Sequence, residues 1–299
     1  MKIERITDLE RQYVMQSLDG QFETHNNYKF VVRLEKAFAE KIGTKHSVGF
    51  VNGTATLHTA LEAAGVTMGD EVIVPPLTMS STSLAVIQAN AIPVFADVDE
   101  KTFLIDPADI EKKITPKTKA IIIVSLFGLM PDMDAIMAIA KKHNLIVIED
   151  DAQCFLGKYK GQNAGTIGHM SSFSFQASKH LTSGEGGMVT TNDDELALQL
   201  RRFSGLGYGS ITMEKARITK DDIQNPAYER HVALGWNYRM SDVVGAVALA
   251  QTERMEELCD MRKASGKIIE EAAAGCDWLI PQYTPAECEH AYWAVAIRM

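Results

Sequence analysis

Residues 119–125 read Lys-Ala-Ile-Ile-Ile-Val-Ser, and this run decides the fold class of the chain. Its centre is apolar at every position and rich in β-branched side chains. Because successive side chains of a strand point to opposite faces, an unbroken apolar run predicts a strand that is buried on both faces. Strands of this kind are typical of parallel sheets that helices cover on both sides.

The sequence on either side of this run alternates short β-branched segments with helical patterns. This alternation predicts an α/β fold with a mainly parallel sheet between helices. The expected strands are Val48–Val51, Glu71–Pro75, Pro93–Asp97 and Leu145–Glu149, and the expected helices are Thr54–Ala64, Ser81–Ala89 and Asp132–His143.

The second half of the chain has a different texture. Two strands, Ser171–Phe175 and Gly187–Thr191, predict a hairpin-like return, and Glu195–Phe203 predicts a helix, whereas Gly205–Tyr228 shows no clear period. A long helical pattern runs from Ser241 to Ala274, with a break expected near Gly266, and His290–Arg298 is expected to form one strand. We therefore expect a large domain over residues 1–240 and the start of a smaller C-terminal α/β domain, incomplete in this chain, over residues 241–299.

The composition excludes several classes of protein. The 299 residues are 46% hydrophobic and 23% charged, which is typical of a globular protein. The net charge of −9 and the absence of a basic run exclude a nucleic-acid or anionic-membrane binder. The longest uncharged stretch, Val72–Ala96, contains prolines and many polar residues, and the N-terminus has no apolar signal region. Four widely spaced cysteines form no C-x-x-C pair, so we expect a cytoplasmic protein with reduced thiols.

Three motifs contain residues that can carry chemistry. The first, Asn52-Gly53-Thr54-Ala55, lies between an expected strand and an expected helix. Free backbone N–H groups at a helix start bind anions, while the alternative is an ordinary N-cap made by Asn52 or Thr54.

The second motif places Ser174 and Lys179 ahead of the turn Gly184-Glu185-Gly186-Gly187. This lysine is a candidate phosphate ligand or Schiff-base nucleophile, and the alternative is a solvated surface charge. The third motif, Glu149-Asp150-Asp151, ends an apolar strand, where open α/β folds bind their ligands. A metal site and a merely hydrated strand end are the alternatives. Because only Cys154 lies nearby among possible His or Cys ligands, we predict no metal.

The order of these motifs resembles the DegT/DnrJ/StrS family of sugar aminotransferases. These are pyridoxal-phosphate enzymes of fold type I, the aspartate-aminotransferase fold, which implies a seven-stranded, mainly parallel sheet. The resemblance covers residues 34–298. Besides the three motifs, it includes Gly69-Asp70-Glu71-Val72-Ile73-Val74-Pro75, Pro93-Val94-Phe95-Ala96-Asp97-Val98, Phe127-Gly128 and Gly235-Trp236-Asn237-Tyr238-Arg239-Met240.

The resemblance implies a role for each matching residue. Lys179 would bind pyridoxal 5′-phosphate covalently and then transfer protons. Asp150 would pair with the pyridine nitrogen, and Gln153 would lie near the phenolic oxygen of the ring. The backbone around Gly53, Thr54 and Ala55 and the hydroxyl of Ser174 would bind the phosphate. Asn237 would reach the phosphate of the neighbouring subunit, which makes a homodimer with shared active sites.

Three positions depart from the family pattern. Met79 stands where an aromatic residue usually stacks on the cofactor ring, and its thioether can lie over that ring instead. His180 replaces the usual asparagine, and Asp151 replaces the usual alanine. A dehydrating branch of the family carries histidine at the position of Lys179, so the lysine favours amino transfer.

The resemblance implies transfer of an amino group, with glutamate as donor, to a keto group of a nucleotide-linked sugar. Two alternatives stay within the same chemistry: a dehydratase, and an aminotransferase for a cyclitol or another cyclic ketone. A third alternative is a non-catalytic regulator that binds the cofactor.

Overall fold

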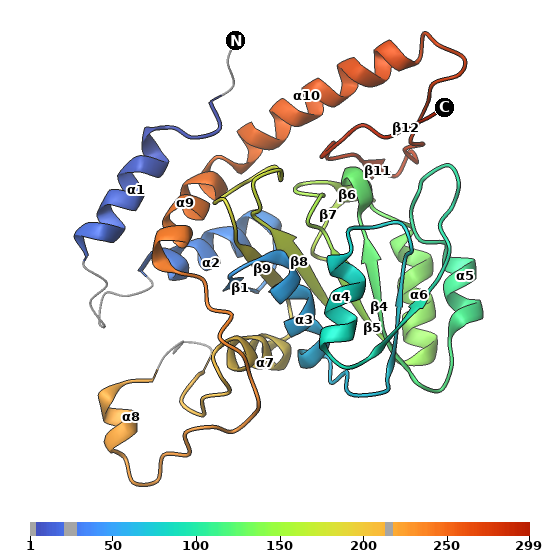
Figure 1. The fold of residues 1–299 in the computed structure, drawn as a ribbon. Helices are drawn as coiled ribbons and strands as arrows, with labels where there is room; N and C mark the ends of the chain where they lie inside the picture. The colour runs from blue at the N-terminus through green and yellow to red at the C-terminus, as the bar shows by residue number, and fades with distance from the viewer. Residues whose placement is uncertain (1–3, 21–28, 213–217) are drawn as a thin grey trace.

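The computed structural model describes residues 4–20, 29–212 and 218–299. A seven-stranded sheet forms its centre, in the order β1-β9-β8-β5-β4-β2-β3 (Figure 1). β9 runs opposite to the other six strands, so the sheet is mixed and mainly parallel, as predicted. The strands are β1 (His46–Phe50), β2 (Glu71–Val74), β3 (Ile92–Phe95), β4 (Thr118–Val124), β5 (Ile146–Asp150), β8 (Met170–Ser174) and β9 (Gly187–Thr191).

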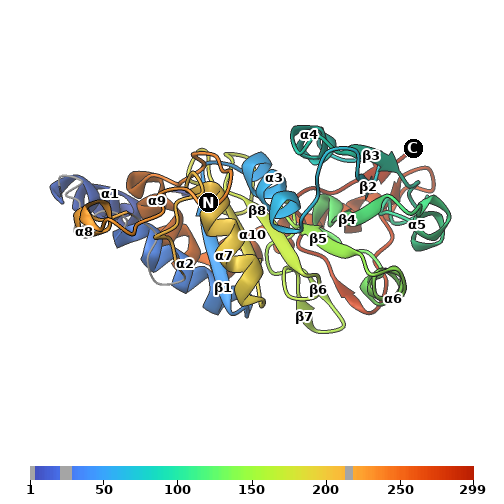
Figure 2. The same cartoon turned by 90° about the horizontal axis from the view of Figure 1, so that it is seen from below.

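Helices cover both faces of this sheet, because the central strands are apolar on both faces (Figure 2). Within β4, Ala120 and Ile122 belong to the cluster under α3 and α4, whereas Ile121 and Ile123 belong to the cluster under α5 and α6. The helices are α1 (Asp8–Asp19), α2 (Lys29–Ile42), α3 (Gly53–Ala63), α4 (Ser81–Gln88), α5 (Pro107–Lys113), α6 (Met133–His143), α7 (Asp194–Ser204), α8 (Lys220–Gln224), α9 (Asp242–Glu253) and α10 (Met255–Ala273), with a 3₁₀ turn η1 (Leu126–Gly128).

The hairpin-like return is confirmed, because β8 and β9 pair antiparallel from Ser171 to Ser174. The expected strands and helices between residues 46 and 204 all form, with ends that differ by a few residues. Two small sheets complete the fold: β11 (Cys288–Glu289) pairs with β6 (Lys158–Tyr159), which also pairs with β7 (Gln162–Asn163), and β10 (Ile280–Pro281) pairs with β12 (Ile297–Arg298).

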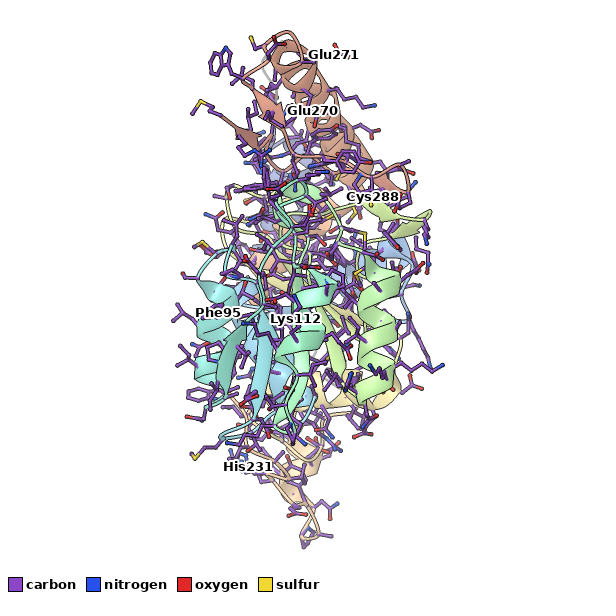
Figure 3. The ribbon with its side chains drawn as sticks, turned by 90° about the vertical axis from the view of Figure 1, so that its right-hand side faces the viewer. Phe95, Lys112, His231, Glu270, Glu271 and Cys288 are labelled. Atoms are coloured by element: carbon purple, nitrogen blue, oxygen red, sulfur yellow. The ribbon has the colours of Figure 1, made fainter. Side chains whose placement is uncertain are left out.

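The described part of the chain between α7 and α9, which includes α8, projects away from the sheet (Figure 1). His231, on this segment, lies at the opposite end of the molecule from Glu270 and Glu271 of α10 (Figure 3). Apolar side chains of the segment face solvent, including Leu234, which is 92% exposed, and Trp236. Residues 213–217, within the stretch for which the sequence showed no period, and residues 1–3 of the N-terminus lie outside the described residues.

Two expectations for the C-terminal part are wrong. The helical pattern from Ser241 breaks at Arg254, the junction of α9 and α10, and not near Gly266. Residues 290–298 do not form one strand either, since only Ile297–Arg298 pairs. Backbone hydrogen bonds hold the rest of that segment against η1: Ala291 N–H donates to Gly128 O (2.7 Å), and Ala294 N–H donates to Phe127 O (3.3 Å).

Gly266 lies within α10 and does not end a helix. Its lack of a side chain makes room for Tyr292. A Cβ at this position would lie 2.4 Å from Cδ1 of Tyr292 and 2.7 Å from its Cβ, so glycine allows Tyr292 to pack closely against α10. At Gly128 (φ +111°) a Cβ would lie 2.7 Å from Tyr292 N and would need a backbone conformation that disfavours side chains. Glycine at positions 128 and 266 therefore allows the segment 290–295 to pack closely against η1 and α10.

We expect Gly266→Ala to lower the free energy of unfolding by about 1–2 kcal/mol, because overpacking against Tyr292 outweighs the helix propensity that alanine gains over glycine. Urea denaturation of the two proteins measures this difference. Ser265→Ala is the control, since Ser265 is exposed on the same turn and its replacement should change stability by no more than about 0.5 kcal/mol. A stabilised Gly266→Ala variant would contradict the packing role.

Candidate active site

A cavity of about 610 Å³ opens at the carboxyl ends of the parallel strands. The residues that line it come from the ends of β4, β5 and β8, the N-termini of α3 and α4, and the distant residue Trp293. Of the residues predicted from sequence, the cavity contains Gly53, Thr54, Met79, Asp150, Gln153, Ser174 and Lys179.

The first motif builds one wall of the cavity from the start of α3. The N-cap alternative is confirmed for Asn52, whose Oδ1 accepts a hydrogen bond from Ala55 N–H (2.8 Å). Ala55 does not line the cavity, because it is buried and its N–H serves the cap. The N–H groups of Gly53 and Thr54 belong to the first turn, where no intrahelical acceptor exists, so these two can meet an anion.

Ser174 completes this wall. It ends β8, and a Cβ at position 53 would lie 2.9 Å from its Cβ. Glycine at 53 therefore allows the start of α3 to close on the Ser174 hydroxyl. The two groups together form a cradle for a phosphate at the positive end of a helix dipole.

The geometry separates the carboxylates of the third motif. Asp150 lines the cavity, and its Oδ2 accepts a hydrogen bond from the Thr82 hydroxyl (3.0 Å). Burial raises the pKa of Asp150, while the Thr82 hydrogen bond and the charge of Lys179 lower it. An enclosed carboxylate of this kind can bind a protonated ring nitrogen.

Asp151 and Glu149 point to the other face of the strand. The Asp151 carboxylate accepts hydrogen bonds from Ser125 (2.6 Å) and Ser171 (2.7 Å), and Glu149 accepts from the backbone N–H groups of Gly165, Ile167 and Gly168. Burial raises the pKa of both, and the pKa of Asp151 stands well above its ordinary value because Glu149 adds like charge. Among the described residues, no cluster of three or more His, Cys, Asp or Glu is arranged to hold a metal.

Lys179 projects into the cavity from the turn after β8. Its Nζ lies 4.7 Å from the centroid of the Trp293 ring, a cation–π distance. Burial lowers the pKa of the amine, Asp150 raises it, and Arg262 lowers it further. A desolvated amine with a lowered pKa is more available as a nucleophile near neutral pH.

His180 and Asn237 do not line this cavity. His180 is buried, its Nε2 donates to Ala291 O (2.9 Å), and burial lowers its pKa to about 3. Asn237 lies outside this cavity, exposed on the projecting segment, where its Oδ1 accepts from Arg239 (2.9 Å).

Sequence reasoning missed Thr82 and Trp293. Thr82 lies in the run Ser80-Ser81-Thr82-Ser83, whose hydroxyls at a helix start were a usable signal. Trp293 gave no such signal, since only the tertiary fold brings it to the cavity.

Comparison with known proteins identifies the relatives of this chain. Residues 4–299 match the DegT/DnrJ/EryC1/StrS aminotransferase family. The GDP-perosamine synthase of Caulobacter vibrioides is 38% identical over 296 residues, covering 99% of this chain and 76% of the relative. The L-glutamine:2-deoxy-scyllo-inosose aminotransferase of Micromonospora echinospora is 37% identical over 271 residues, covering 90% of this chain and 63% of the relative.

Solved structures agree with the fold. The aminotransferase of Psychrobacter cryohalolentis superposes with a TM-score of 0.87 at 34% identity, covering 98% of this chain and 75% of that one. The solved relatives include one in its PLP-form. No helix among the described residues is long and apolar enough to span a membrane.

Replacing Asp151 should flatten the dependence of stability on pH. Because the raised pKa lets native Asp151 keep a proton that the unfolded chain releases, the free energy of unfolding falls as pH rises from the ordinary aspartate value of 3.8 towards the raised one. Asp151→Asn removes this loss, and its amide can still bond Ser125 and Ser171. We expect it to unfold at higher urea concentration than the wild type at pH 7.

Exposed Asp260 of α10 provides the matched control, and Asp260→Asn should leave the pH dependence unchanged. If Asp151→Asn unfolds at lower urea at pH 7 and keeps the wild-type slope with pH, the buried proton is assigned to the wrong residue.

Proposed function

Because this chain belongs to the DegT/DnrJ/EryC1/StrS aminotransferase family, we propose that it uses pyridoxal phosphate to transfer an amino group from glutamate to a keto group of a nucleotide-linked sugar. The observation that carries the proposal is the single cavity that joins Lys179, Asp150 and the start of α3. The family is one of aminotransferases that act on nucleotide sugars or cyclitols, so the choice of a nucleotide sugar is part of the proposal.

The residues present fit the cofactor. The Gly53–Ser174 cradle offers N–H and hydroxyl donors to a phosphate, and a side chain at 53 would fill it. Asp150 offers a buried carboxylate to the pyridine nitrogen, and Lys179 an amine to the aldehyde. Bound pyridoxal phosphate would supply an electron sink for the carbon that loses its proton.

With the cofactor bound, each side chain of the cavity would have a separate role. The Lys179 amine would hold the cofactor covalently and would serve as the base that accepts and returns the proton of the reacting carbon. The Asp150 carboxylate, which accepts a hydrogen bond from Thr82, would keep the ring nitrogen of the cofactor protonated. Gln153 accepts a hydrogen bond from Phe127 N–H (2.7 Å), which orients its side chain at the cavity. Exposed Met79 lies at the mouth, at the position of the usual stacking ring.

We also propose a homodimer in which Asn237 serves the partner's site. Asn237 lies outside the cavity of its own chain, on a segment that exposes Leu234 and Trp236. An exposed apolar patch of this kind is typical of a contact with another protein. A second copy would cover this patch and place the Asn237 amide near a phosphate.

The first test locates the cofactor and the substrate. We expect borohydride reduction of the protein saturated with pyridoxal phosphate to leave the adduct on Lys179, as read by peptide mass mapping, and Lys179→Ala to leave none. Nucleotide keto sugars and cyclic ketones, each supplied with glutamate, are then compared by mass spectrometry of the aminated product.

An adduct on another lysine would refute the assignment of Lys179. Amination of a cyclitol ketone alone would replace the nucleotide sugar as substrate, deoxygenation of the sugar would indicate a dehydratase, and an adduct without turnover would indicate a regulator.

A second test concerns the shared site. Lys179→Ala and Asn237→Ala are each expected to be inactive as homodimers. When they are mixed, one site of the hybrid carries both changes and the other carries neither, so the hybrid should regain one wild-type site. Activity is measured after native mass spectrometry confirms hybrid formation. Confirmed hybrids without activity would show that Asn237 does not act across the interface.

A further inference from the structure

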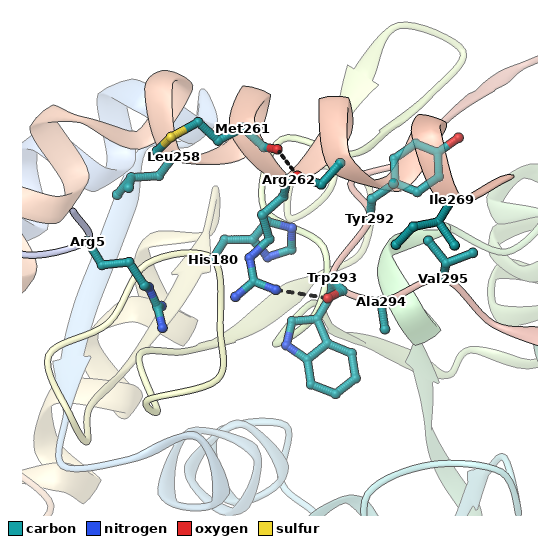
Figure 4. Close-up of a pocket in the computed structure, with 12 residues that line it drawn as sticks. Arg5, His180, Leu258, Met261, Arg262, Ile269, Tyr292, Trp293, Ala294 and Val295 are labelled. Carbon is teal, nitrogen blue, oxygen red and sulfur yellow. Dashed lines mark hydrogen bonds between the residues drawn. The ribbon is translucent and has the colours of Figure 1, made fainter. Parts of the chain in front are cut away.

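A second cavity, of about 360 Å³, lies between α10, the segment 290–295 and the turn that carries Lys179 (Figure 4). Trp293 lines both this cavity and the candidate active site. The guanidinium groups of Arg5 and Arg262 enter this space from the N-terminal arm and from α10. The wall between the two cavities therefore consists of the lysine turn and Trp293.

Arg262 holds both parts of this wall. Its Nη2 donates to Ser178 O (2.7 Å) and Lys179 O (3.0 Å), and its Nη1 donates to Trp293 O (2.9 Å), the bond drawn in Figure 4. One planar fork thus joins the carbonyl of the candidate catalytic lysine to the residue whose ring lies beside the lysine amine.

Other contacts share this arrangement. Trp293 Nε1 donates to Ser178 O (3.0 Å), which closes a ring of hydrogen bonds between the turn and residue 293. Arg5 donates to Ala177 O (2.7 Å) and Lys179 O (2.6 Å) but makes no hydrogen bond to Trp293 among the described residues. Arg262 therefore couples the turn to the backbone of Trp293, beside the direct contact that the indole makes with Ser178 O.

We propose that Arg262 is a positioning residue for Lys179, which fixes the lysine turn and Trp293 in one geometry and so sets where the amine stands in the active-site cavity. This inference rests on the proposed role of Lys179. It extends the site to α10, an element that contributes nothing to the lining of the active-site cavity.

The charge of Arg262 has a second effect on the same amine. Its hydrogen bonds within the described residues go to neutral carbonyl oxygens, so its positive charge remains available to act on Lys179. That charge lowers the pKa of the Lys179 amine, with burial as the larger cause, while Asp150 opposes both. Arg5, on the N-terminal arm, adds a second positive charge next to Arg262, and His180 is neutral at physiological pH.

Two substitutions separate geometry from charge. Arg262→Gln removes both the fork and the charge, whereas Arg262→Lys keeps the charge but cannot span three carbonyls. Lys263→Gln is the matched control, because it removes one charge from the same turn of α10 at a side chain that bonds only Leu156 O within the described residues. The first readout is the pH midpoint for trace acetylation of Lys179 in cofactor-free protein, by peptide mass spectrometry. The second is the rate at which added pyridoxal phosphate develops its lysine-bound absorbance.

We expect Arg262→Gln to move the acetylation midpoint to higher pH and to slow binding of pyridoxal phosphate by about 10–100-fold, the cost of misplacing a reacting group. Arg262→Lys should keep the wild-type midpoint and remain slow. Lys263→Gln should match the wild type in both. If Arg262→Gln fails to fold, Arg262→Lys decides the question by itself, because it keeps the charge and loses the fork that joins the three carbonyls.

Wild-type rates in Arg262→Gln would overturn the proposal, and so would full recovery of the rate in Arg262→Lys, since the charge alone would then suffice. Failure of the wild type to link pyridoxal phosphate to Lys179 would instead refute the proposed function. In that case the acetylation of Lys179 still tests the role of Arg262. An acetylation midpoint that is unchanged in Arg262→Gln would show that Arg262 does not act on the amine.

Discussion

Burial of the central strands on both faces is the constraint on which the rest of this structure depends. Because β4 and β5 lie under helices on either side, polar side chains within them have no access to water. Chemistry is therefore confined to the strand ends, where Asp150 and Ser174 emerge next to helix N-termini. Glu149 is a charged residue that is nevertheless buried within β5. Three backbone N–H groups from residues 165–168 donate hydrogen bonds to its carboxylate and so compensate for the lost water.

Successive side chains of a strand point to opposite faces, and this explains why the adjacent acids of the motif Glu149-Asp150-Asp151 have different surroundings. At the end of β5, Asp150 faces the cavity while Glu149 and Asp151 bond groups away from it, so only Asp150 of the three acids is available to a ligand there. The sequence already contained this information, because a period of two separates residue 150 from its neighbours.

The core of the fold could be predicted from local patterns, because apolar runs and helical periods are properties of neighbouring residues. The C-terminal part could not. Gly266 resembles a helix break in the sequence, yet the space for Tyr292 requires it, and Tyr292 is remote in the sequence. Residues 290–298 have the composition of a strand, but Ala291 and Ala294 bond the backbone of η1, and only Ile297–Arg298 pairs with a strand. Trp293 was missed for the same reason, since its contact with Lys179 exists only in the folded chain.

These long-range contacts make the active-site cavity depend on more than the sheet. η1 binds the segment 290–295 through Gly128 and Phe127, and Phe127 N–H also donates to Gln153 in the cavity. The segment in turn carries Trp293 to Lys179 and accepts the hydrogen bond from His180 at Ala291. His180, which departs from the family pattern, thus ties the lysine turn to the segment rather than entering the cavity. Ser174 and Asp150 lie at strand ends beside the starts of α3 and α4, whereas the turn that carries Lys179 is also held by the C-terminal segment and by α10.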